Sequence, residues 1–159
     1  MAPAAPRSPF LRSRGLLIPK HPQITTGRLR AALRSDSYER KECDAVARVV
    51  QEGDVVLELG GGIGYMSTLL SVTRRVARVT SYEANPALIP YIRSMHAANG
   101  VTNVDLHNAL LSPEPGSPVA FHVRRNLLAS SMDRDSDPDS ITRTVQVPRQ
   151  PLAEVLAQM

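Results

Sequence analysis

The sequence has only one cysteine, Cys43, in 159 residues. A single cysteine excludes an internal disulfide and a zinc site made of cysteines. A lone cysteine more often occupies a buried helix position than it serves as a reactive thiol. Because the chain does not depend on disulfides, we expect it to be cytoplasmic, in a reducing environment.

Long hydrophobic runs are also missing. No apolar segment approaches the roughly 20 residues that a membrane-spanning helix needs, so we expect no membrane insertion. The rest of the composition is that of a globular protein, since 42% of the residues are apolar and 159 residues is near the usual size of one domain. The sequence therefore predicts a compact unit with an apolar core.

Acidic residues are absent from the first 34 positions, which contain seven Arg or Lys residues, whereas the whole chain has a net charge of +4. We expect residues 1–35 to form a basic, Pro/Arg-rich arm. Three interpretations are open: an arm that binds nucleic acid or another anionic surface, a presequence, or a flexible extension that leads into a lid. The prolines favour the extension, and Phe10 alone offers no aromatic array for stacking bases.

The middle of the chain contains an apolar strand that leads into a glycine turn, Val55-Val-Leu-Glu-Leu-Gly-Gly-Gly-Ile-Gly-Tyr65. An amphipathic helix over 66–76 follows the turn. Glycine can adopt a positive φ and lets a ligand approach the backbone closely. This arrangement predicts a pocket for a nucleotide-type cofactor, with Gly60, Gly61, Gly62 and Gly64 as binding residues.

The spacing separates two cofactor classes. A dinucleotide-binding turn reads G-x-G-x-x-G, but here Tyr65 stands where the third glycine is needed. The pattern present is Glu58-x-Gly60-x-Gly62-x-Gly64, and a carboxylate before the glycines repels a diphosphate and attracts an amino group or a sulfonium. We therefore include Glu58 among the cofactor-binding residues and rank a nicotinamide-dependent enzyme last.

A second acidic residue, Glu83, closes the next predicted strand, about 20 residues after the glycine turn. A carboxylate at this place is typical of ribose recognition, because it offers only acceptors and a diol offers two donors. The ordered combination with Glu58 is more specific than the glycines alone. It predicts that Glu83 binds the ribose of the cofactor.

The pattern as a whole predicts an α/β Rossmann-like fold, a mostly parallel sheet with flanking helices. Strands over 53–60, 78–83 and 103–109 alternate with helices, so the crossovers should be right-handed and the ligand should lie at the strand carboxyl ends. Asn108, at the end of the third strand, is expected on the adenine side of the cofactor.

Other segments complete this expectation. A helix over 38–51 is predicted before the first strand, capped by Asp36 or Ser37. The segments 118–123 and 142–148 are expected to be short strands beside the main sheet. We expect no metal site, because no cluster of acidic or Cys/His residues accompanies His96 and His107, and the loop from Asp133 lacks the glycine and glutamate of a calcium loop.

From Tyr38 to Met159 the sequence resembles the FkbM family of class I S-adenosylmethionine-dependent methyltransferases. The resemblance is carried mainly by Glu58-Leu-Gly-Gly-Gly-Ile-Gly64 and Tyr82-Glu83-Ala-Asn-Pro86, with weaker support from Tyr38-Glu39, Gly53-Asp54, Asn99-Gly100, Ala129-Ser130-Ser131, Val145-Gln-Val-Pro148 and Leu152-Ala-Glu-Val-Leu156. It implies that residues 36–159 bind S-adenosyl-L-methionine. It also implies methyl transfer to a hydroxyl oxygen of a small molecule or sugar, with no nucleic-acid partner.

Members of that family continue into a strand that ends in Asp-x-Glu-Gly-x-Glu, which this sequence lacks. We therefore expect a C-terminally incomplete sheet whose strand over 55–59 has an open edge, covered by a second copy or by a partner chain. Two other functions stay open: a non-catalytic S-adenosylmethionine-binding or scaffold protein, and an RNA-directed methyltransferase relative that uses the basic arm. We nominate no catalytic residue; position alone suggests His107 or Glu39 as a base.

Overall fold

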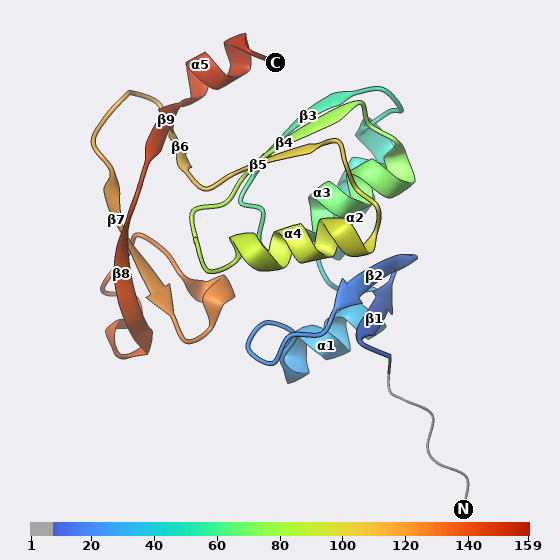
Figure 1. Cartoon of the computed structure of the whole chain (residues 1–159), viewed down its shortest axis with the longest axis horizontal. Coiled ribbons are helices and arrows are strands. Elements are labelled where there is room, and N and C mark those ends of the chain that lie inside the picture. Colours follow the sequence, from blue (N-terminus) through green and yellow to red (C-terminus); the bar gives the residue numbers. More distant parts are fainter. Residues whose placement is uncertain (1–7) are drawn as a thin grey trace, which may run out of the picture.

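A three-stranded parallel sheet forms the centre of the computed structural model, which describes residues 8–159 (Figure 1). Its strands are β3 (Val55–Leu59), β4 (Arg78–Tyr82) and β5 (Val104–His107), in that order. All three were expected from the sequence within two residues. The consecutive order follows from short crossover helices, which place successive parallel strands side by side.

Helices connect these strands as a Rossmann-like fold requires. The helix α2 (Arg40–Val49) precedes β3, α3 (Tyr65–Leu69) continues into the π-helical turn η1 (Leu70–Arg74), and α4 (Ile89–Ala98) joins β4 to β5. Figure 1 shows α3 and α4 together below the sheet, and these two helices contact each other. The predicted fold class, a Rossmann-like methyltransferase fold with a mostly parallel sheet, is confirmed.

Most of the predicted basic arm is folded. A hairpin of β1 (Phe10–Ser13) and β2 (Leu16–Pro19) precedes α1 (Gly27–Arg34). Arg14 and Gly15 form its two-residue turn with φ of +45° and +84°, which is the geometry of a tight hairpin. Residues 10–34 are therefore not a flexible extension. The proposed domain boundary at residue 35 stays a prediction, and the first seven residues of the arm lie outside the described part of the chain.

The hairpin and α1 belong to the largest apolar core. Their apolar side chains pack against α3 and α4 because the outer face of these helices is itself apolar. The buried members of this cluster are Leu11, Leu16, Ile18, Ile24, Leu29, Leu33, Cys43, Ile63, Tyr65, Leu69, Leu88, Tyr91, Ile92 and Met95. Cys43 is buried in α2, where the sequence favoured it.

The predicted cap of α2 is wrong. The helix begins at Arg40, its first turn has no side-chain cap, and Asp36 serves the hairpin instead. The Asp36 carboxylate accepts hydrogen bonds from Ser13 Oγ and from the Arg14 backbone N–H, both at 2.8 Å. The Asp36 carboxylate therefore binds the hairpin, whereas the local sequence predicted that it would cap α2.

The last 50 residues form smaller sheets at the carboxyl ends of the central strands (Figure 1). The strands β7 (Val119–Arg124) and β8 (Ile141–Val147) pair antiparallel, and β6 (Leu110–Ser112) pairs parallel with β9 (Arg149–Pro151) before α5 (Leu152–Ala157). Two 3₁₀ turns, η2 (Leu127–Ala129) and η3 (Pro138–Ser140), lie between β7 and β8. The two strands that the sequence predicted here are present, but they pair with each other rather than with the central sheet.

The outer edge of β3 carries no neighbouring strand within residues 8–159. Val55 and Leu59, at its two ends, are 46% and 63% exposed. In the same part of the chain, no helix is long and apolar enough to cross a membrane, and no three His, Cys, Asp or Glu side chains gather as metal ligands would.

Candidate cofactor-binding site

A cavity of about 460 Å³ lies at the carboxyl ends of the central strands, between the sheet and the C-terminal segment. Three parts of the chain meet there: the glycine turn after β3, the segment after β4, and residues from β6, β7 and η2. Its wall is largely apolar with few polar groups, as in most small-molecule sites. The lining residues are Leu59, Gly60, Gly62, Tyr82, Glu83, Ala84, Asn85, Leu88, Ala109, Leu110, Leu111, Phe121, Leu127, Leu128 and Ser130.

The glycine turn is attached to the end of β4. The backbone N–H groups of Gly60 and Gly61 donate to the carbonyl of Tyr82 at 2.8 and 3.0 Å. Gly62 has a φ of +55°, a conformation that favours glycine, and its N–H donates to the Glu83 carboxylate. The turn therefore leaves a strip of backbone without side chains beside the cavity.

Glu83 is the acidic group of the cavity and is 7% exposed. Its carboxylate accepts the N–H of Gly62 at 2.8 Å and that of Asn85 at 2.6 Å. Burial raises its pKa, and the backbone hydrogen bonds oppose that shift. A carboxylate has about four acceptor positions, so two remain for the hydroxyls of a ribose. The residues present thus fit the predicted ribose site.

Glu58 lies elsewhere than the sequence suggested. Its carboxylate accepts the N–H of Ser67 in α3 at 2.9 Å and the hydroxyl of Ser81 in β4. Burial raises its pKa to about 7, although both hydrogen bonds oppose the shift. Glu58 does not line the cavity, so in this structure it fastens α3 to the sheet beneath the glycine turn.

Three further predicted site residues also lie behind the cavity wall. Asn108 donates its amide to the carbonyls of Glu83 at 2.8 Å and Ala84 at 3.0 Å. Gly61 and Gly64 pack against α4, where an added Cβ would lie 3.3 and 2.9 Å from Ile92 side-chain atoms. Gly60, Gly62 and Glu83 are therefore the predicted residues that line the cavity, and the others hold these three in place.

The C-terminal segment supplies residues that sequence reasoning missed. Asn85 donates to the carbonyl of Leu127 at 3.0 Å and to Ser130 Oγ at 3.2 Å, which ties η2 to the segment after β4. Phe121 of β7 adds an aromatic wall. No local motif signals these contacts, because they join residues more than 40 positions apart.

Arg124 holds the loop that follows. It is 2% exposed, and its guanidinium donates to three backbone carbonyls and two hydroxyls. The acceptors are the carbonyls of Ala129, Asp133 and Asp137 and the hydroxyls of Ser131 and Ser136. A buried cation with donors in a planar fork fixes several acceptors at once, so Arg124 sets the shape of residues 129–137.

The two residues considered as a base do not line the cavity. The His107 ring stacks on Tyr82 with centroids 4.8 Å apart and planes 15° from parallel. Glu39 directly precedes α2, and burial raises its pKa. Among the lining residues, only Glu83 and Tyr82 have ionisable side chains. The arrangement is equipped to bind and orient a cofactor rather than to move protons.

Residues 34–108, slightly less than half of the chain, match the family model of the TRM5/TYW2 methyltransferase domain. The matched segment contains the glycine turn, Glu58, Glu83 and Asn108. No curated protein matches the chain significantly.

Three solved structures are similar to parts of the chain. Wild-type Trm5b from Pyrococcus abyssi has a TM-score of 0.48 at 20% identity, over 67% of this chain and 33% of that one. The putative transferase PH0793 from Pyrococcus horikoshii has 0.48 at 14%, over 71% and 50%. MtNAS in complex with MTA and tNA has 0.39 at 23%, over 52% and 33%. This chain thus spans a third to a half of the length of these structures.

The family match confirms one prediction and corrects two. An S-adenosylmethionine-dependent methyltransferase domain was expected, and it is confirmed. The resemblance to the FkbM family is wrong, because the model that matches residues 34–108 is that of the TRM5/TYW2 methyltransferase domain. The expected small-molecule acceptor without nucleic acid depended on that resemblance and is wrong with it. Both errors have the same cause. The motifs that carried the resemblance are those that bind the cofactor, and they carry no information on the acceptor.

Proposed function

We propose that this chain is the cofactor-binding part of an S-adenosylmethionine-dependent methyltransferase that acts on tRNA. The observation that carries the cofactor assignment is Glu83, held by the N–H of Gly62 in an apolar cavity with two acceptor positions free. The TRM5/TYW2 match supports RNA as the substrate class.

The cavity residues divide the binding between them. Glu83 would accept hydrogen bonds from the two ribose hydroxyls. Gly60 and Gly62, which have no side chains, would let the cofactor approach the backbone closely. Tyr82 and Phe121 would contact the adenine. When bound, S-adenosylmethionine supplies a methyl group on a positively charged sulfur, which leaves as a neutral thioether when a nucleophile attacks the methyl carbon. The protein then contributes mainly proximity and orientation, which agrees with a lining whose ionisable side chains are Tyr82 and Glu83, the latter assigned to the ribose.

Methyl transfer to RNA tests this proposal. The full chain is incubated with S-adenosylmethionine carrying a labelled methyl group, once with unmodified tRNA transcripts and once with hydroxylated sugars. We expect label in tRNA only, and its loss in Glu83→Ala. Label in the sugars with none in tRNA would overturn the RNA substrate, and a folded chain that labels neither would overturn the proposed activity.

A further inference from the structure

A second cavity, of about 750 Å³, lies beside the cofactor cavity. Residues 21–24 form one side of it, the first half of α4 lies between, and β7 with β8 forms the other side. Figure 1 shows the loop before α1 facing the β7–β8 pair below α4. Leu127 lines both cavities, so the two cavities are adjacent at this residue.

The rim of this second cavity is cationic. Arg125 and Arg143 line it and are exposed. Neither forms an ion pair with any residue from 8 to 159, where the paired arginines are Arg14, Arg75 and Arg78. No Asp or Glu lines the cavity. Two guanidinium groups thus face the solvent with their donors free for an anionic ligand.

Two aromatic side chains, Tyr91 and His21, also line the second cavity. Tyr91 donates its hydroxyl to the carbonyl of Pro19 at 2.7 Å, which fixes it in the floor with Ile24 and Val123. His21 lies edge-on to it, with centroids 5.9 Å apart and planes 79° apart. His21 is half-buried and lines the cavity. Guanidinium groups beside a ring are the combination that single-stranded nucleic acid recognition uses.

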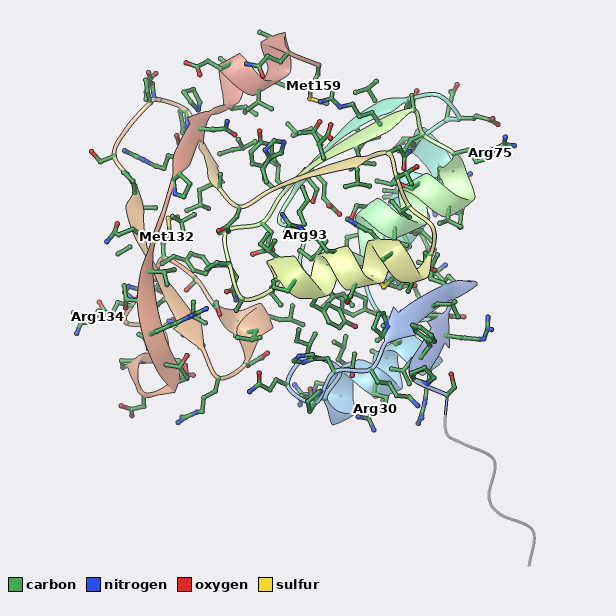
Figure 2. The ribbon with its side chains drawn as sticks, in the orientation of Figure 1. Arg30, Arg75, Arg93, Met132, Arg134 and Met159 are labelled. Carbon is green, nitrogen blue, oxygen red and sulfur yellow. The ribbon has the colours of Figure 1, made fainter. Side chains whose placement is uncertain are left out.

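The positive charge continues past the cavity. Lys20, next to His21 in the chain, lines a neighbouring opening of about 600 Å³ together with Arg30 and Arg34. No acidic residue lines this opening either. In Figure 2, Arg30 lies at the lower margin and Arg134 at the left margin of the view, whereas Arg75 lies at the right margin. Figure 2 thus places Arg30 and Arg134 away from Arg75.

We propose that the cavity between residues 21–24 and the β7–β8 pair is the docking site of a single-stranded stretch of the RNA substrate. Phosphates of the strand would contact Arg125 and Arg143, since a guanidinium fork matches phosphate oxygens. A base would stack on His21. A strand in this position passes Leu127, which brings the next nucleotide to the cofactor cavity. The inference rests on the proposed tRNA methylation and adds the surface that holds the RNA.

Charge-matched double variants test the site. Binding of unmodified tRNA and of a single-stranded RNA oligonucleotide to the full chain is measured by fluorescence anisotropy at several salt concentrations. Arg125→Gln with Arg143→Gln removes the two rim cations. Arg48→Gln with Arg75→Gln removes two exposed cations that line neither this cavity nor the opening at Lys20. Affinity for S-adenosylmethionine is measured in parallel to show that both variants fold.

We expect the rim variant to lose at least about tenfold in RNA affinity at 0.1 M salt. The salt slope should fall by about 1.4, from about 0.7 for each lost phosphate contact on a single strand. The control variant should change neither value by more than about twofold, and cofactor affinity should stay unchanged in both. His21→Ala should weaken oligonucleotide binding without changing the salt slope, because a stacking contact releases no counterions.

Equal losses in both double variants would overturn the docking site and would leave tRNA methylation standing if the wild type transfers label to tRNA. Binding to anionic lipid vesicles is measured for the same proteins. If the rim variant lost vesicle binding but kept its RNA affinity, the cations would belong to a membrane-binding surface, and the inference would be overturned. A wild-type chain that neither binds nor methylates RNA would overturn the docking site and the proposed function together.

Discussion

The side-chain amide of Asn108 donates to the backbone carbonyl of Glu83 at 2.8 Å. A second hydrogen bond from the same amide reaches Ala84 at 3.0 Å. Asn108 therefore connects the end of β5 to the segment after β4, and it sets the position of the carboxylate without lining the cavity. By these contacts Asn108 positions the segment that carries Glu83.

Asn108→Ala should weaken cofactor binding and stability together. Two carbonyls lose their donor, so the free energy of unfolding should fall by about 1–2 kcal/mol. Affinity for S-adenosylmethionine should fall several-fold, because Glu83 is less well held. Chemical denaturation and calorimetry measure the two effects. A large loss of affinity with unchanged stability would mean that Asn108 contacts the cofactor directly.

The glycines at 62 and 64 should differ in their tolerance of a methyl group. Both have a positive φ, at +55° and +73°, but a Cβ on Gly64 would lie 2.9 Å from Ile92 Cγ2, whereas on Gly62 its nearest neighbour is Tyr38 Oη at 3.9 Å. Gly62→Ala should cost about 1 kcal/mol from the backbone alone, and Gly64→Ala about 3 kcal/mol because packing strain is added. Urea unfolding of the two variants compares them, and equal costs would contradict the close packing of the turn on α4.

Glu58 predicts a pH dependence of stability. Its pKa rises from 4.5 in a free side chain to about 7 in the folded protein, because burial disfavours the charged form. The folded state therefore holds the proton more tightly than the unfolded state. The stabilisation is fully present below pH 4.5 and is lost as the pH rises through 7, by a total of about 3 kcal/mol.

Glu58→Gln removes this ionisation while it keeps an acceptor for Ser67. The difference in unfolding free energy between wild type and Glu58→Gln should change between pH 5 and pH 8 in favour of the variant. Other titrating groups are common to both proteins and cancel in the difference. A difference that is constant with pH would show that Glu58 does not titrate in this range.

Arg124 should matter for the shape of the C-terminal loop. Its replacement leaves five acceptors of residues 129–137 without their donor, so Arg124→Met should lose about 3 kcal/mol of stability. Arg124→Lys keeps the charge but not the planar fork and should recover less than half of that loss. Unfolding measurements give the energies, and limited proteolysis should show earlier cleavage within the loop in both variants. Wild-type stability in Arg124→Met would contradict the role.

Local signals in the sequence were sufficient for the sheet and for part of the site. The glycine turn and Glu83 follow from short-range spacing around two strands, and both lie where the spacing placed them. The alternation of side chains along β3 also predicts which face of the sheet Glu58 occupies. Val56 packs with Leu70 and Val76, and a residue two positions later in a strand lies on the same face. Its role as an anchor for α3 was thus available from the sequence.

Long-range contacts account for what the sequence did not predict. The hairpin at residues 10–19 was obscured by the prolines and arginines of the first 34 residues, and its burial depends on an apolar surface of α3 and α4 that is distant in the chain. Asn85 meets Ser130 across 45 residues, and no pattern links the two. The expected small-molecule acceptor was wrong because the cofactor motifs from which it was inferred do not specify the acceptor. The cytoplasmic location stays a prediction.

Titration of S-adenosylmethionine into the purified chain by calorimetry tests the central claim most directly. We predict binding at one site with a dissociation constant of about 10⁻⁶ M. Glu83→Ala should weaken it at least about thirtyfold, since two charged hydrogen bonds to the ribose are lost. Glu114→Ala, at an exposed carboxylate that does not line the cavity, should leave it unchanged. No binding by the folded wild type, or equal binding by Glu83→Ala, would contradict the cofactor site.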